Sequence, residues 1–435
     1  MRYDKKTLAV QWHITDRCQK KCAHCYIGGR TCNEMTYLQV EKILFDLSNY
    51  AKKNGIHYEF YITGGDPLLH TQYCGILQLF HERGLSYSIM CNPESINVEN
   101  LNKLSELGVR SIQFSVDGMK EKHDTIRGKK SFEKLVSAIE MTKNAKIPVA
   151  MMFTLYRFNS DDLFKVMKLA DELQVERFSF DLGISIGSAE KNHLEMIPSL
   201  ELIEVLKKYI ALKKHIKEKG TKTFFEEKCN LINAIRISQG DFFCPDEEMP
   251  VIFDGCQIGV NDFVIDVDGD VLGCRRLGKS SVCGNLLKTS FEEIWCESPY
   301  LLEQRNKVLK KDKCKDCVSR SWCQGCEAYE QGFAQQSEQV AQVLCGQSLF
   351  IPNKSRFSEF KFQNKSEFEK IFILLDDGLK IVASEDFKKE YVCILFDEIR
   401  KREILNNYIM YSDKYAVSKE MARLLYYFYV IRLKM

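Results

Sequence analysis

The sequence predicts an α/β fold: a partial (β/α)6 TIM-like barrel, followed by a cysteine-rich domain and a small α+β tail. Over residues 8–220, short apolar runs alternate with amphipathic stretches, which is typical of βαβ units around a parallel sheet. Cysteines then become dense between Cys256 and Cys345, where long periodic segments are few. Regular patterning returns in the tail, which holds only Cys393.

The barrel prediction rests on six apolar runs that read as strands. Six strand–helix units are too few for a complete eight-fold barrel, so we expect an open barrel with its ligands at the carboxyl ends of the strands. The predicted strands span residues 8–15, 58–65, 86–93, 111–118, 148–156 and 177–183, and the predicted helices span residues 36–55, 97–108, 131–146, 161–174 and 199–220.

The predicted domain boundaries follow from these changes of pattern. They are a barrel over residues 1–220, a helical bridge over 221–255, the cysteine-rich domain over 256–350 and the tail over 351–435. In the tail, residues 369–384 alternate around an Asp-Asp-Gly turn and predict a hairpin. The segments 390–409 and 418–435 read as helical or mixed.

Composition excludes several classes of partner. A formal net charge of +2 gives no electrostatic reason to expect nucleic acid or a membrane surface. No stretch approaches ~20 apolar residues, and the N-terminus lacks the apolar core of a signal peptide, so we expect a cytoplasmic protein. Eighteen cysteines in a large chain with its own core favour metal or iron–sulfur ligation over disulfides.

A three-cysteine loop follows the first predicted strand. Cys18, Cys22 and Cys25 form C-x3-C-x2-C, and three thiolates can hold three irons of a 4Fe–4S cube while the fourth iron takes an outside ligand. A closed zinc site would need a fourth protein ligand, and His24, next to Cys25, would normally point away. Another metal, or unligated thiols, remain the alternatives.

Two further motifs end the second and fourth predicted strands. In "TGGDP", Gly64 and Gly65 would let backbone groups approach a ligand closely, although such a segment alone is commonly a turn. In "FSVDGMKEKHDTIRG", helix capping and surface polarity are the alternative for Asp117 and His123.

The second cysteine field begins with Cys256 and Cys274, the latter delivered by the predicted hairpin "VIDVDGDVLGC". A C-x2-C-x5-C-x2-C run and a last thiol follow. Without context, this run could equally be a zinc ribbon or knuckle. Its members are Cys314, Cys317, Cys323 and Cys326, followed by Cys345.

Taken together, these motifs resemble the radical S-adenosylmethionine superfamily. The resemblance implies that the loop cluster binds S-adenosylmethionine at its open iron and reduces it to a 5′-deoxyadenosyl radical. It implies that His24, just before the third cysteine, lies near the adenine, with Tyr26 just beyond that cysteine. The Gly64-Gly65-Asp66 segment would bind the methionine amino group, with Asp66 replacing the usual Glu. Ser115 would reach the ribose or carboxylate, Asp117 would belong to the same site, and Arg127 would pair with the carboxylate.

The second cysteine field resembles the SPASM domain, which holds auxiliary 4Fe–4S clusters. The resemblance assigns Cys314, Cys317, Cys323 and Cys345 to one cluster and Cys256, Cys274 and Cys326 to the other. The second set is one ligand short. Either this cluster has an open iron, or Cys244, Cys283 or Asp262 completes the set. The last spacing of x2 departs from the usual x3.

Motif wording over about residues 8–345 resembles peptide maturases of ACGX-repeat type. This resemblance implies a ribosomal cysteine-rich precursor peptide as substrate, a thioether as a possible product, and a reductant such as flavodoxin or ferredoxin. It assigns no catalytic acid or base. An anaerobic sulfatase maturase, which makes formylglycine, is the alternative, but Arg275 stands where those enzymes carry an aspartate. The other alternative is a non-enzymatic iron–sulfur or zinc protein that serves electron transfer or scaffolding. The tail is either a packing extension or a leader-peptide module.

Overall fold

The structure is a computed structural model that describes residues 7–27, 32–228, 256–310 and 326–334, together with Ile232 and two short strands in the tail. The chain divides into two compact units. The first contains residues 1–229, 257–306 and 326–342, and the second contains residues 230–256, 307–325 and 343–435.

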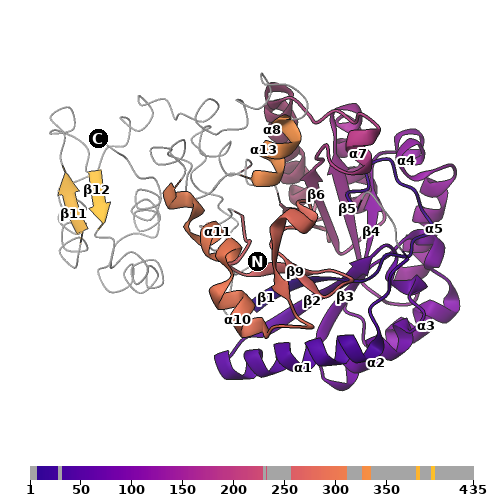
Figure 1. The fold of residues 1–435 in the computed structure, drawn as a ribbon. Helices are drawn as coiled ribbons and strands as arrows, with labels where there is room; N and C mark the ends of the chain where they lie inside the picture. Colours follow the sequence, from indigo (N-terminus) through magenta and orange to yellow (C-terminus); the bar gives the residue numbers. More distant parts are fainter. Residues whose placement is uncertain are drawn as a thin grey trace, which may run out of the picture. The chain divides into compact units, whose positions relative to one another are not determined.

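The first unit is built on a ten-stranded sheet with the order β10-β9-β8-β1-β2-β3-β4-β5-β6-β7 (Figure 1). Strands β1 to β6 are parallel and follow one another in chain order, which confirms the predicted α/β fold and partial barrel. They span Thr7–Thr15, His57–Gly64, Ser86–Met90, Ile112–Val116, Val149–Leu155 and Arg177–Leu182.

Further strands extend both edges of this six-stranded core. β7 (Phe224–Glu227) pairs parallel with β6, so the prediction of a helical bridge is wrong at these residues. Two adjacent phenylalanines, one of them buried, give the segment its strand character. On the other edge, β8 (Asp262–Ile265) pairs parallel with β1 and antiparallel with β9 (Asp270–Leu272), and β10 (Val282–Asn285) follows. The predicted hairpin over "VIDVDGDVLGC" is confirmed by the β8–β9 pairing.

Helices cover the outer side of the curved sheet (Figure 1). Helix α1 begins after Thr36, whose side chain caps the backbone of Gln39, and ends at Gly55 in the left-handed conformation. The helices of the barrel are α1 Tyr37–Asn54, α2 Tyr73–Glu82, α3 Val98–Glu106, α4 Lys120–Arg127, α5 Ser131–Asn144, α6 Asp162–Glu172, α7 Ser188–Lys191 and α8 Ser199–Glu218, and those that follow are α10 Phe291–Glu297, α11 Pro299–Lys310 and α13 Glu327–Ala334. Four 3-10 turns are η1 Pro67–Leu69, η2 Pro93–Ser95, η3 Arg157–Asn159 and η4 Gly278–Ser281.

Strand β1 divides its side chains between two environments. Trp12 faces the helical layer, where its ring lies 5.9 Å from that of Phe80 on α2. Its neighbours Gln11 and His13 point to the opposite side of the sheet, the barrel interior, where both contact Tyr26. The core therefore sits between sheet and helices, and the polar side chains of β1 are left for the site.

In the second unit, β11 (Leu379–Val382) pairs antiparallel with β12 (Cys393–Phe396). The β11 residues belong to the second half of the predicted tail hairpin, whose first half lies outside the described residues. The β12 residues fall in a segment that we interpreted as helical or mixed, and they form a strand.

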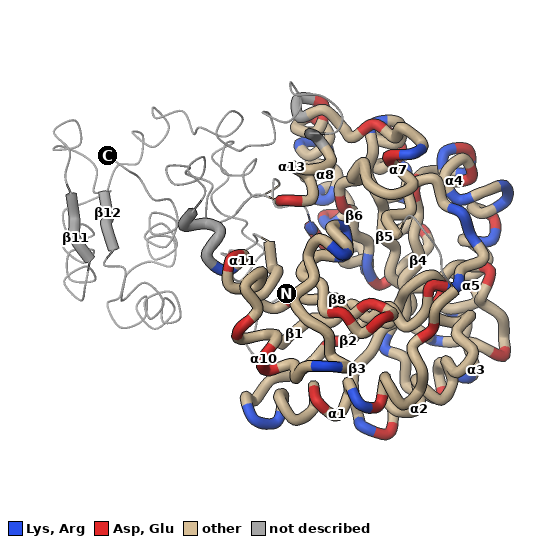
Figure 2. Tube along the Cα trace, viewed as in Figure 1, with Lys and Arg blue, Asp and Glu red and all other residues tan. Residues whose placement is uncertain are grey.

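The distribution of charged residues agrees with the low net charge. Figure 2 shows acidic and basic positions interspersed along the outer helices of the barrel, as expected for a net charge near zero. Among the residues searched, no helix is long and apolar enough to cross a membrane.

Candidate functional site

The loop that follows β1 packs directly on the end of β2. The backbone N–H of Gly65 donates to the carbonyl of Thr15 at 2.7 Å, and that of Asp66 donates to Arg17 at 2.7 Å. A Cβ atom built on Gly64 or Gly65 would lie 2.1 Å from a carbonyl oxygen of this loop. The two glycines therefore allow close approach, as expected, but the group that approaches them in the structure is the backbone of the cysteine loop.

Asp66 connects this loop to the ends of β2 and β3. Its buried carboxylate accepts hydrogen bonds from Gln19 (2.8 Å), from the hydroxyl of Ser95 (2.6 Å) and from the backbone N–H groups of Leu68 (3.1 Å) and Asn92 (3.3 Å). Burial raises the pKa of Asp66, and these hydrogen bonds oppose the rise. Asp66 thus anchors the loop, and its assignment to the methionine amino group stays a prediction.

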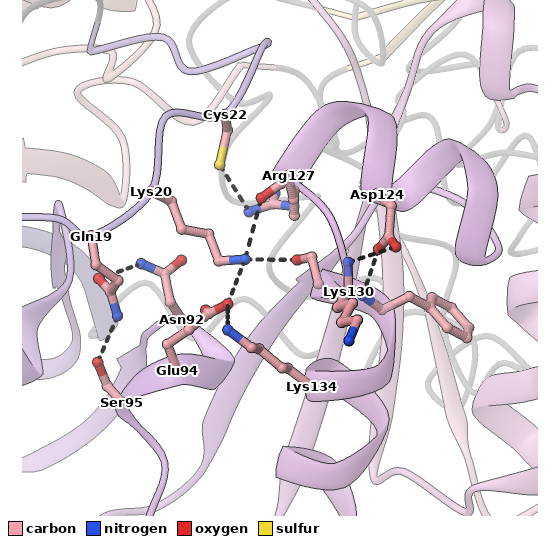
Figure 3. Close-up of polar contacts among 12 residues, drawn as sticks. Gln19, Lys20, Cys22, Asn92, Glu94, Ser95, Asp124, Arg127, Lys130 and Lys134 are labelled. Atoms are coloured by element: carbon pink, nitrogen blue, oxygen red, sulfur yellow. Dashed lines mark hydrogen bonds and ion pairs between the residues drawn. The ribbon is translucent and has the colours of Figure 1, made fainter.

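Cys18 is held by a side chain from the end of β3. The amide Nδ2 of Asn92 lies 3.3 Å from the Cys18 sulfur. The same nitrogen lies 3.1 Å from Oε1 of Gln19 (Figure 3). Gln19, Asn92 and Ser95 were missed by the sequence analysis. For Asn92 and Ser95 a signal was present, because these polar residues lie at the carboxyl end of the third predicted strand and just beyond it, where ligands are expected.

Two buried cations lie against the middle of the loop. Lys20 is 2.9 Å from Glu94 and donates to the hydroxyl of Ser131 at 2.6 Å (Figure 3). A guanidinium nitrogen of Arg127 at the end of α4 lies 3.8 Å from the Cys22 sulfur. Burial raises the pKa of the Cys22 thiol, and the charge of Arg127 opposes that rise.

Arg127 also belongs to a buried charge cluster with Asp117 and His24. Oδ2 of Asp117 is 2.9 Å from His24 and accepts a short hydrogen bond from Arg127. Burial alone would raise the pKa of Asp117, but Arg127 and His24 hold it well below its usual value. Asp117 is therefore an anion beneath the loop, and the structure brings these three predicted residues together.

The other carboxylate oxygen of Asp117, Oδ1, is buried and has no hydrogen-bond partner among the described residues. A buried acceptor without a donor costs free energy, and a hydroxyl or ammonium group of a bound ligand would satisfy it. This atom fits a cosubstrate with such donors.

The other residues predicted to bind the cosubstrate have different surroundings. The ring of His24 stacks on Tyr156, with centroids 6.2 Å apart. The hydroxyl of Tyr26 points into the barrel, 3.3 Å from His13. Ser115 lies on β4, opposite Met152 of β5.

The donor set of the loop suits an iron–sulfur cluster. Cys18, Cys22 and Cys25 follow one strand, and the amide of Asn92 and the guanidinium of Arg127 face two of the thiols, as donors to thiolate sulfur would. In the part of the chain that was searched, no three His, Cys, Asp or Glu side chains gather as ligands of a single ion. A cube differs, because each thiolate binds its own iron.

Only part of the second cysteine field is described. Burial is the main cause of the raised pKa of Cys274, and the nearby Cys326 also contributes to the rise. The thiol of Cys283 donates to the carbonyl of Ser281 at 3.3 Å. Cys256 belongs to the second unit. Cys244, Cys314, Cys317, Cys323 and Cys345 lie outside the described residues, so their assignments stay predictions.

Asp262, one of the residues suggested to complete the second set, lies on β8. Burial raises its pKa to about 6, and the charges of Arg275 and Lys228 oppose the rise. Its role as a ligand stays a prediction.

A parallel partial barrel with three thiols at the carboxyl end of its first strand defines a class of α/β cofactor enzymes. Residues 12–170 match the Radical SAM superfamily, and residues 256–318 match SPASM, an iron–sulfur cluster-binding domain. The chain therefore carries a radical SAM domain and a SPASM domain. Its cofactors are accordingly 4Fe–4S clusters and S-adenosylmethionine.

Two relatives in sequence and one solved structure are similar to this chain. An AdoMet-dependent heme synthase of Oleidesulfovibrio alaskensis is 26% identical over 77% of this chain and 86% of its own length. The sporulation killing factor maturation protein SkfB of Bacillus subtilis is 24% identical over 69% of this chain and 67% of its own. The crystal structure of Streptococcus suis SuiB bound to precursor peptide SuiA has a TM-score of 0.61 at 15% identity, covering 75% of this chain and 73% of that one.

Proposed function

We propose that this radical S-adenosylmethionine enzyme modifies a ribosomally made, cysteine-rich precursor peptide, with a thioether as the product. The observation that carries the proposal is the shared fold with SuiB, which was solved bound to its precursor peptide, over three quarters of this chain. The similarity to the maturation protein SkfB supports it independently. An open barrel suits a peptide, because an extended chain can enter from its open side.

In this proposal the cofactors, when bound, supply a 5′-deoxyadenosyl radical that removes a hydrogen atom from the peptide. Cys18, Cys22 and Cys25 would hold the loop cluster, and Arg127 would orient Cys22. The free oxygen of Asp117 and the ring of His24, backed by Tyr156, would orient the cosubstrate. Asp66 keeps the loop in place through Gln19. The SPASM thiols would hold the auxiliary clusters, and a flavodoxin or ferredoxin would supply electrons.

The decisive experiment is a maturation assay with the precursor peptide encoded beside the gene. The reconstituted, reduced enzyme with S-adenosylmethionine should lower the peptide mass by two hydrogen atoms and block one cysteine against alkylation. The matched control is a Cys18→Ala/Cys22→Ala/Cys25→Ala variant, which should leave the peptide unchanged. An unchanged peptide beside steady formation of 5′-deoxyadenosine by the wild type would contradict the proposal.

A second candidate is a tetrapyrrole substrate, which the similarity to the heme synthase favours. Incubation of the same enzyme with an iron porphyrin that carries propionates tests it. A change in the porphyrin mass that depends on S-adenosylmethionine, with no change in the peptide, would select this candidate.

The sulfatase-maturase alternative has less support. The residue after Cys274 is Arg275, and a guanidinium cannot act as a base at neutral pH.

A further inference from the structure

Two adjacent arginines, Arg275 and Arg276, follow β9 in the first unit. Arg276 forms an ion pair with Asp181 at the end of β6, and its guanidinium lies over the ring of Tyr329, 5.5 Å from the centroid. The Tyr329 hydroxyl donates to Oδ1 of Asp181 at 2.9 Å. The carboxylate of Asp181 is therefore already bound by Arg276 and Tyr329.

Arg275 is held differently. One of its terminal nitrogens donates to Oε1 of Gln11 on β1 at 2.9 Å, and the other lies 3.9 Å from Asp181, at the limit of an ion pair. No other acceptor for its donors is present among the described residues. Its side chain is 34% exposed, so these donors can be reached. Arg275 thus lies between the first and last strands of the six-stranded core, and part of the N–H donors of its guanidinium group have no acceptor among the described residues.

This fork lies one side chain away from the cysteine loop. Gln11, which accepts from Arg275, donates to the hydroxyl of Tyr26 at 3.3 Å, and Tyr26 follows Cys25 directly. A substrate group bound at Arg275 would therefore hold the rest of the molecule beside the loop where the radical forms.

The electrostatic surroundings favour an anion at this point. Burial and the charge of Arg275 lower the pKa of His13 to about 4, so His13 is neutral at pH 7. Lys228 is a second cation in this region, and its charge and that of Arg275 both act on the carboxyl group of Asp262. Glu226 faces Lys228 at 3.6 Å, and Asp181 is already paired with Arg276.

We propose that Arg275 binds a carboxylate of the substrate and, with Gln11 holding the guanidinium, positions the substrate next to the cysteine loop. The inference deepens the proposed function. A planar guanidinium binds a carboxylate through two parallel hydrogen bonds, which fix orientation as well as affinity. The carboxylate comes from an acidic residue or the C-terminus of a peptide, or from a porphyrin propionate, and the test separates these two sources.

The test is anaerobic calorimetry on the holoenzyme with two probes, the precursor peptide encoded beside the gene and an iron porphyrin with propionates. Arg275→Met should weaken binding of one probe roughly tenfold to a hundredfold, the range expected for a charge-assisted pair. Arg275→Lys, which keeps the charge but loses the fork, should lose less. Arg83→Met is the matched control, because Arg83 ends α2 on the outer side and pairs with Glu41 at 3.7 Å.

A substrate-side variant protects the test from misfolding of Arg275→Met. Peptides with single Asp→Asn or Glu→Gln changes should show the same loss at one position with the wild-type enzyme, and no additional loss with Arg275→Met. Arg83→Met should keep its iron content, its uncoupled formation of 5′-deoxyadenosine and its affinity for both probes.

The outcomes are distinct. Equal affinities of wild type and Arg275→Met for both probes, or binding of neither probe by the wild type, would overturn the inference. Porphyrin binding that depends on Arg275, without peptide binding, would support the carboxylate site and contradict the peptide substrate. A peptide that is modified as proposed, but bound equally by Arg275→Met, would contradict the carboxylate site alone.

Discussion

At the scale of single residues, Asp117 shows how a buried charge is stabilised here. One of its oxygens faces Arg127 and His24, and the guanidinium of Arg127 also faces Cys22. Removing one member of such a cluster leaves its partner buried and unpaired, which costs more than the pair itself contributes.

Arg127→Met should therefore lower the free energy of unfolding by about 3 to 5 kcal/mol, because it leaves the Asp117 carboxylate buried without its main cation. The Asp117→Asn/Arg127→Met double variant should recover part of the loss. Urea denaturation of wild type, both single variants and the double variant measures this as a double-mutant cycle. Additive losses would contradict the coupling.

His13 predicts a specific pH dependence of stability. Its pKa falls from 6.5 to about 4 in the folded protein, mainly by burial. Below pH 6.5 the unfolded chain binds a proton that the folded protein does not, so stability is full above that pH and decreases as the pH falls toward 4.

The expected decrease is roughly 3 kcal/mol for a shift of this size. His13→Gln should show a flatter profile in denaturation experiments across this pH range. Parallel profiles of the two proteins would show that folding does not lower the pKa of His13.

At the scale of elements, the cysteine loop depends on the end of β2. Gly65→Ala places a Cβ against the carbonyl of Arg17, 2.1 Å away, and neither backbone can move without breaking the hydrogen bonds at Gly65 and Asp66. We expect the loop to be displaced and its cluster lost, about four of about twelve irons if three cubes are present.

Gly75→Ala is the control for that change. Gly75 lies in α2, and an added Cβ would make ordinary contact with Tyr37 at 3.6 Å, so iron content and stability should be retained. Iron and sulfide counting with thermal unfolding measures both variants. Full iron content in Gly65→Ala would mean that the loop tolerates the displacement.

The sequence predicted elements with strong local patterns. Strands β1 to β6 and helices α1, α3, α5, α6 and α8 have clear apolar periodicity, and the structure confirms them. Helix α4, "KEKHDTIR", was missed because it buries only His123 and Ile126. The pairing of β1 with β8 could not be predicted, because no local pattern specifies which distant strand completes an edge.

The same limit applies to the site: its motifs could be located from the sequence, but the contacts between distant segments could not. Cysteine spacing and the Gly-Gly and Asp-Gly motifs located the loop, Gly64 and Asp117. The contacts of Gln19 with Asp66 and of Arg275 with Gln11 depend on which strand ends face one another, and that depends on the register of the sheet.

At the scale of the whole molecule, the tail is the region whose function is still to be tested. If residues 351–435 bind the leader of the precursor, deleting them should weaken precursor binding at least tenfold while uncoupled formation of 5′-deoxyadenosine is kept. Calorimetry and product analysis of the truncated enzyme measure the two effects separately. Equal precursor affinity would assign the tail to packing alone.

The place of β1 in the sheet has a consequence for synthesis on the ribosome. Its residue Ala9 pairs with Glu59 on one side and with Asp262 on the other. The first edge is satisfied early, but the second stays open until the chain has grown past residue 265, and closing so long a loop is slow. During that interval the nascent barrel presents an unpaired strand edge, a surface that is prone to pair wrongly with other chains.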